Sequence, residues 1–175
     1  MFKKCLKRGG ELFEEKTEHI DSWLSSGDVS ECCLITDLFL LLVFLLFQYG
    51  TLPDQVPGHY NRAGDVDRWD RKEGLFILPI IAIVLWISMT VLEKYPHRYN
   101  YLNLTEKNAE IQYQNGRLMV HTLKNEVLIL FSFISFKNVK IASGASEDIG
   151  VLFMPISVGV VLVTITFFVV RMLRN

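Results

Sequence analysis

Hydrophobic residues gather in long blocks along this chain instead of recurring at regular intervals. Uncharged blocks occupy 75–92 and 149–170, and a shorter block, 34–49, carries Asp37 near its start. A membrane-crossing helix needs about 20 mostly apolar residues, because lipid tails offer no partner to backbone N–H and C=O groups. The three blocks therefore predict spanning helices, with Asp37 at the level of the lipid headgroups.

A further apolar block, 118–141, is interrupted by charge. Its part from Val127 onward is too short to cross alone, and His121, Lys124 and Glu126 precede it. A lysine near a helix end can extend its charge to water, so we expect a fourth crossing with these groups at the interface. The alternative is a partly buried amphipathic helix and three crossings in total.

The charge pattern outside the apolar blocks predicts an orientation. Basic residues are more frequent in 1–33, in 93–117 and after 170 than in the remaining connections, and positive charge favours the cytoplasmic side. We therefore expect an all-α integral membrane protein with four transmembrane helices and both termini in the cytoplasm. Segment 1–33 would be cytoplasmic, either as an amphipathic helix on the membrane surface or as a solvated tail.

Two smaller expectations concern the connections. Residues 105–117 predict a cytoplasmic helix with Thr105 as its N-cap and Gly116 as a weak point. Residues 52–74 hold so much proline, glycine and polar side chain that neither a strand nor an ordinary helix is expected. We predict an ordered extracytoplasmic loop there, with Trp69 at the membrane–water interface.

Composition narrows the function classes. Half of the 175 residues are hydrophobic and the formal net charge is −1, which disfavours nucleic acid as a partner and favours the lipid bilayer. Cys5, Cys32 and Cys33 form no CxxC pair, so neither a disulfide framework nor a zinc site is expected. No cofactor or structural metal is predicted.

The 52–74 segment also resembles a known family. The residues that carry the resemblance are Leu52, Pro53, Pro57, His59, Tyr60, Asn61, Gly64, Asp67 and Trp69, and a second group comprises Asn100, Tyr101, Thr105, Asn108, Gln112 and Tyr113. Together they are similar to a bacterial multi-pass membrane family of unknown function, domain of unknown function sixteen-forty-eight. That domain also forms the N-terminal part of Sdp-type toxin-immunity proteins, which are longer and cross the membrane more often. The resemblance implies a bacterial cell membrane, a role in toxin immunity or envelope signalling, and a peptide toxin or regulatory protein as partner.

Two groups of side chains are candidates for a site, and neither matches a catalytic motif. In the 52–74 segment the candidate binding residues are Asp54, His59, Asn61, Asp65, Asp67 and Trp69. Imidazole, amide and carboxylate groups could hold a divalent cation or could satisfy backbone groups of the loop. The alternative function that follows is a membrane-embedded metal-dependent hydrolase.

The second group lies within the interrupted block. His121 and Asn125 share a helix face, whereas Lys124 and Glu126 point in different directions. Ionisable residues in a span suggest a functional role, here a transporter or accessory subunit, although interface anchoring explains them as well. With no GxSxG, P-loop or dinucleotide motif, we expect a non-enzymatic membrane protein.

Overall fold

A computed structural model describes residues 34–174 of the chain. The chain divides into two compact units, Met1–Asp37 and Leu38–Asn175, and the contacts reported below lie in the second unit. The expected amphipathic segment and the cysteines fall outside the described residues.

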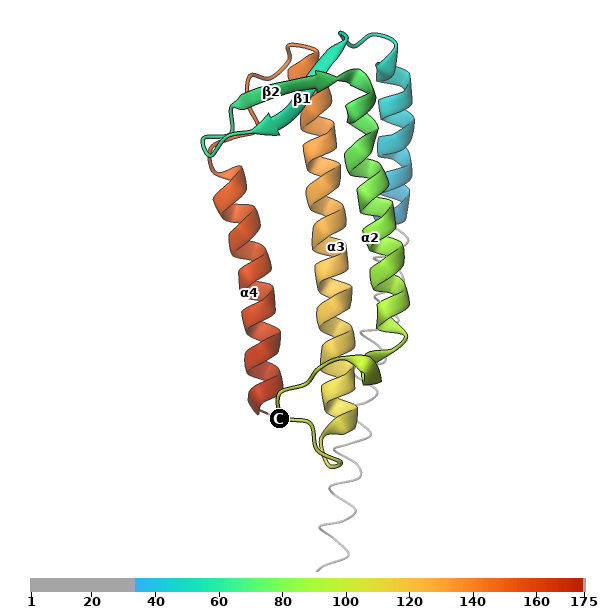
Figure 1. Ribbon diagram of the computed structural model, residues 1–175, viewed down its shortest axis with the longest axis vertical. Coiled ribbons are helices and arrows are strands. Elements are labelled where there is room, and N and C mark those ends of the chain that lie inside the picture. The colour runs from blue at the N-terminus through green and yellow to red at the C-terminus, as the bar shows by residue number, and fades with distance from the viewer. Residues whose placement is uncertain (1–33, 175) are drawn as a thin grey trace, which may run out of the picture. The chain divides into compact units, whose positions relative to one another are not determined.

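Helices account for most of the second unit. The first described helix, Leu34–Tyr49, is apolar and short. It is followed by α2 (Ile77–Glu93), α3 (Ala109–Ala142) and α4 (Phe153–Arg174). In Figure 1 the long helix α3 runs between α2 and α4 and packs against both.

Three of these helices are long and apolar enough to cross a membrane, counting the 3-10 turn Lys72–Phe76 together with α2. Their outward-facing side chains are largely apolar: Ile80 of α2 is 57% exposed and Val163 of α4 is 70% exposed. Such surfaces are unfavourable in water and suit lipid tails. The architecture is therefore that of a membrane protein.

Helix α3 combines two segments that the sequence pattern separates. Residues 109–117 of the expected cytoplasmic helix and the whole span 118–141 belong to one continuous helix of 34 residues. The N-cap of this helix is Asn108, so the expectation of a cap at Thr105 is wrong. Asn108 instead organises the preceding loop: its Oδ1 accepts a hydrogen bond from Thr105 N at 2.7 Å, and its Nδ2 donates to Asn103 O at 2.8 Å.

Gly116 does not interrupt α3, and its lack of a side chain has a packing reason. A methyl group at this position would lie 2.5 Å from the Tyr101 hydroxyl and 2.9 Å from Cδ2 of Tyr99. Both tyrosines belong to the connection between α2 and α3, where their hydroxyls donate to Pro96 O and Leu92 O. The glycine thus allows this connection to pack directly on the α3 backbone.

The all-α expectation needs one correction, because 52–74 folds as a β-hairpin. Strands β1 (Gln55–Tyr60) and β2 (Val66–Arg71) pair antiparallel as a two-stranded sheet. Proline is tolerated in edge strands, and both strands of a two-stranded sheet are edges. Gly58 is also required here, since a Cβ would lie 2.2 Å from the Asp70 carboxylate.

The hairpin is fixed to the helices at several points. It lies across one end of α3 (Figure 1), and Val56 of β1 is almost fully buried. The Tyr60 hydroxyl donates to Asn138 Oδ1 of α3. At the hairpin tip, Ile149 N donates to Gly64 O at 3.1 Å. These contacts make the hairpin a rigid cap on this end of the helices.

Candidate functional site

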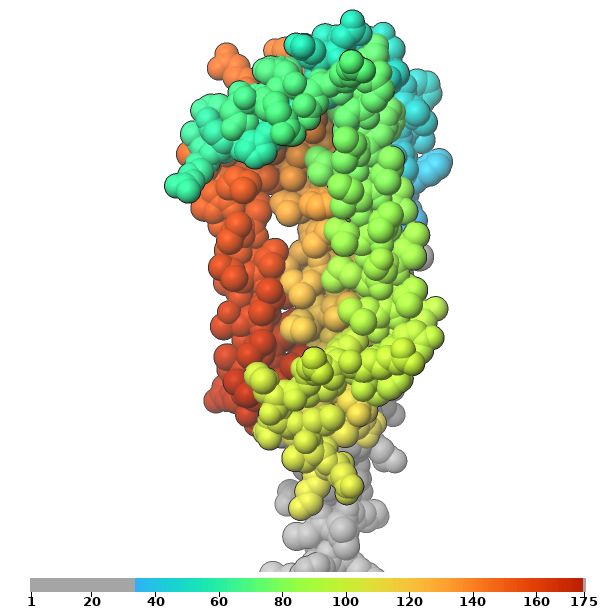
Figure 2. All heavy atoms as spheres, viewed as in Figure 1, coloured from blue at the N-terminus to red at the C-terminus, as the bar shows by residue number. Residues whose placement is uncertain are grey.

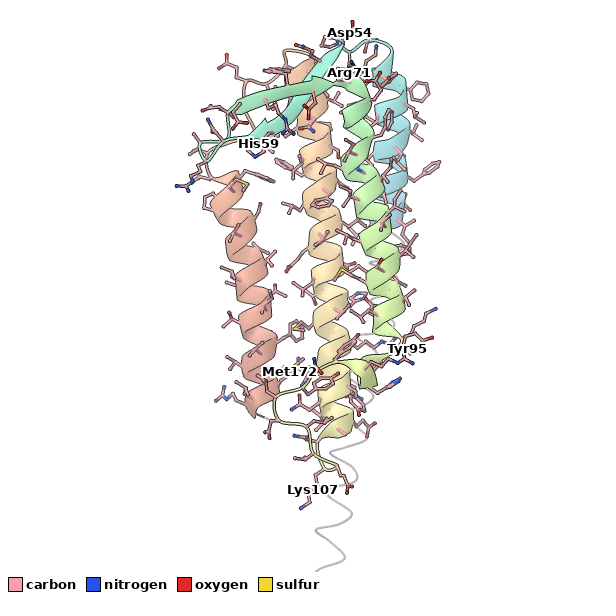
Figure 3. All side chains as sticks on the ribbon, viewed as in Figure 1. Asp54, His59, Arg71, Tyr95, Lys107 and Met172 are labelled. Carbon is pink, nitrogen blue, oxygen red and sulfur yellow. The ribbon has the colours of Figure 1, made fainter. Side chains whose placement is uncertain are left out.

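The hairpin brings some of its candidate residues together and separates others. His59 Nδ1 lies 2.7 Å from Asp67 Oδ1 across the two strands, and both side chains are exposed. Asn61 Nδ2 donates to Asp65 Oδ2 at 3.1 Å, and Asn61 Oδ1 accepts from two backbone N–H groups of the turn. Asp54 lies away from His59 along the hairpin (Figure 3) and faces Lys72 at 3.5 Å.

These contacts favour a structural role for the polar residues of the hairpin. Each carboxylate of the candidate set has a partner within the hairpin or at its base. Within residues 34–174, no group of three or more His, Cys, Asp or Glu side chains is placed to hold a metal ion. Trp69 remains 47% exposed on β2, opposite Pro57. The hairpin thus offers an outer surface with one aromatic ring beside ion-paired polar groups.

A second polar cluster joins α2 to α3. Lys124 is completely buried, and its Nζ lies 2.8 Å from Glu93 Oε1 and 3.3 Å from Thr90 Oγ1. His121 Nδ1 lies 3.5 Å from the same Glu93 oxygen, and Asn125 Nδ2 is within 3.2 Å of His121 Nε2. We call these five residues the Lys124 cluster.

The contacts of the Lys124 cluster compensate the buried charge of Lys124. A buried ammonium group is costly unless a carboxylate and further hydrogen bonds compensate it. Glu93 supplies the charge, Thr90 supplies an oxygen, and the Trp86 ring lies 5.7 Å from Nζ. Because Glu93 is the last residue of α2, the cluster fixes where this helix ends against α3.

Glu126 belongs to a different surface. It points toward α4, where Thr164 Oγ1 donates to its Oε1. Its other oxygen, Oε2, is buried without a hydrogen-bond partner among the described residues. The expectation that Lys124 and Glu126 point in different directions is therefore confirmed: one faces α2 and the other faces α4.

The end of the helices opposite the hairpin is closed by the connection between α2 and α3. Gln112 Nε2 of α3 donates to Met172 O of α4 at 2.8 Å, at the end marked by Met172 in Figure 3. Burial raises the pKa of the Tyr101 phenol to about 12, and burial also raises the pKa of Tyr99. The neutral phenols therefore persist as hydrogen-bond donors in this connection.

Several important residues were not recognised in the sequence. Glu93 stands directly after the apolar block 75–92, where a charged residue ordinarily marks the end of a span. Thr90, Thr164 and Asn138 are small polar residues whose partners come from other helices or, for Asn138, from strand β1. One signal was available: opposite charges at Glu93 and Lys124 lie in successive antiparallel helices, so a pair was geometrically reasonable.

Comparison with known proteins supports the similarity of this chain to a family of unknown function. Residues 38–83 match the family described as Domain of unknown function (DUF1648). This region contains most of the first described helix, the hairpin and the first part of α2. An uncharacterized protein from Archaeoglobus fulgidus is 30% identical over 108 residues, which cover 55% of this chain and 57% of that protein. The chain thus spans little more than half of this relative, and no solved structure matches it.

Proposed function

We propose that this chain is a multi-pass protein of a bacterial cell membrane that crosses the bilayer four times, with both termini in the cytoplasm. It acts by binding a partner and not by catalysis, and its setting is toxin immunity or envelope signalling. The partner is a peptide toxin or a regulatory protein that meets the hairpin from outside. The similarity of residues 38–83 to the DUF1648 family supports this setting only through the resemblance described above.

The observation that carries the proposal is the rigid exposed hairpin. Its inner strand is anchored through Val56 and Tyr60, while His59, Asp67 and Trp69 are exposed. A surface held by a scaffold loses little conformational entropy when a partner binds. Exposed aromatic rings are also frequent anchors in protein interfaces.

Cysteine labelling tests the topology. Arg62 at the hairpin tip and Glu106 in the connection between α2 and α3 are both exposed, so Arg62→Cys and Glu106→Cys form a matched pair. We expect an impermeant maleimide to label Arg62→Cys in intact cells and Glu106→Cys only after permeabilisation. The opposite pattern, or equal labelling of both, would refute the proposed orientation.

Deletion of the gene tests the role. Cells lacking the protein should become more sensitive to at least one secreted peptide toxin, and the wild-type gene should restore resistance. Trp69→Ala, which removes an exposed ring, should restore less, whereas Arg62→Ala should restore fully. Unchanged sensitivity across a broad toxin panel would eliminate the immunity role and leave the topology result intact.

A second candidate function, a transporter or accessory subunit, is favoured by the fully buried Lys124. Ionisable groups inside a helical membrane protein often line a substrate or proton path. The charge-neutral combination Glu93→Gln with Lys124→Met separates the two candidates. If the Lys124 cluster lines a path for a substrate or proton, this double variant should lose transport. Unchanged transport in liposomes that contain the purified double variant would leave the cluster a structural role only.

A further inference from the structure

Helices α3 and α4 enclose an apolar groove on the side of α3 that faces away from α2. Its volume is about 520 Å³, within the range of about 300–1,000 Å³ typical of small-molecule sites. The hollow between α3 and α4 is visible in Figure 2. Its walls include Ile129, Leu130 and Phe133 from α3 and Ile156, Val160 and Val161 from α4.

The groove contains one acidic side chain, Glu126. Thr164 donates one hydrogen bond to this carboxylate, and the buried Oε2 has no partner among residues 34–174. Lys124, two residues earlier, faces the other helix and is paired with Glu93 at 2.8 Å. An ionised carboxylate among apolar walls with a single donor is strongly disfavoured unless a positive charge approaches it.

We propose that this groove binds an apolar cation, in which one positive charge is surrounded by aryl or alkyl groups, as in arylphosphonium and quaternary ammonium compounds. The charge would lie beside Glu126 and the apolar groups between α3 and α4. Phe133 and Phe153 stack with ring centroids 5.1 Å apart and both line the groove. Aromatic rings add a favourable interaction with a desolvated cation.

Charge complementarity selects this occupant over others. A lipid tail or an apolar helix of a second copy would fill the walls equally well, but neither would offset the carboxylate. The groove also lies apart from the outer surface of the hairpin, so the inference does not depend on the role proposed above.

Binding of tetraphenylphosphonium to the full chain in detergent micelles or nanodiscs tests the inference by equilibrium dialysis. We expect one saturable site. Glu126→Gln removes the charge but keeps an oxygen that accepts from Thr164, and should weaken binding by more than about tenfold. Val161→Trp should abolish binding by filling the groove. Glu110→Gln, an exposed position on the same helix, should bind as the wild type does.

Several results would overturn the inference. One is the absence of saturable binding, and another is equal binding by Glu126→Gln in a variant that keeps its helical circular dichroism. Competition by tetraphenylborate, which has the same shape and the opposite charge, would show that the groove selects only apolar bulk. A dimer that Val161→Trp dissociates, or a lipid retained by the wild type and lost in that variant, would identify a different occupant.

Discussion

Lys124 Nζ on α3 lies 2.8 Å from Glu93 Oε1 at the end of α2, and the lysine side chain is completely buried. The pair explains how a charged residue is accommodated in the middle of the longest helix. It also places the end of α2 beside the middle turns of α3. The first turns of α3 therefore extend beyond α2, where the connection between the two helices packs on Gly116.

Removing one partner of this pair should cost more than removing both. Lys124→Met removes the nearer basic partner of the Glu93 carboxylate and leaves His121 at 3.5 Å, and we expect unfolding in detergent to become easier by about 3–5 kcal/mol. The double variant with Glu93→Gln should recover much of that loss. Lys140→Met, at an exposed position on the same helix, should change stability by less than about 1 kcal/mol. If the stability losses of Lys124→Met and Glu93→Gln alone add up to the loss of the double variant, a direct interaction between the two residues is contradicted.

Two glycine-to-alanine changes should have opposite effects. At Gly116 the new methyl group would meet the Tyr101 hydroxyl at 2.5 Å, so we expect a loss of about 1–3 kcal/mol. At Gly159, within α4, nothing lies within 4 Å of the new atom. Alanine there should stabilise the helix by about 0.5–1 kcal/mol. Thermal unfolding in the same detergent compares them, and equal shifts would argue against close packing at Gly116.

The anchor of the hairpin should be measurable as a coupling energy. Tyr60→Phe and Asn138→Ala each remove the hydrogen bond between β1 and α3. Their double-mutant cycle should give a coupling of about 0.5–1.5 kcal/mol. A cycle that combines Tyr60→Phe with Asn108→Ala, in the connection at the other end of α3, should give none. Zero coupling in the first cycle would show that the hairpin is not held by this bond.

Stability should fall at alkaline pH. Burial raises the pKa of Tyr60 from its ordinary value of 10.0 to about 12, because the charged phenolate is poorly solvated in the folded protein. The neutral phenol therefore contributes full stability below about pH 10, and this contribution is lost as the pH rises toward 12, since the unfolded chain ionises first. Unfolding measured across this range should show a shallower decline in Tyr60→Phe. Tyr101, whose pKa is also raised to about 12, should still cause part of the decline in stability in that variant.

The spanning helices were predictable because one physical requirement dominates them. Long uncharged stretches must satisfy their own backbone hydrogen bonds in lipid, and such stretches lie in α2 and α4. The first described helix ends at Tyr49, where its apolar block also ends. Continuity of α3 across Gly116 was harder to foresee, because helix propensity does not record the tyrosines packed against that glycine.

The hairpin and the Lys124 cluster depend on contacts between distant segments. Pro57 and Gly58 argue against a strand by local propensity, yet both fit a two-stranded ribbon whose inner strand packs on α3. For Lys124, the charge and the helix face can be read from the sequence, but the axial register of α2 against α3 cannot. That position depends on packing along both helices, so Glu93 could not be identified as the partner from spacing alone.

The bond between Gly64 and Ile149 has a mechanical consequence. Ile149 and Gly150 form part of the rim of the groove, and the tip of the hairpin is bonded to that rim through Ile149 N and Gly64 O. While this bond holds, the tip and the rim cannot be displaced independently. A displacement of the hairpin is therefore transmitted, through this backbone hydrogen bond, to the rim of the groove beside α4.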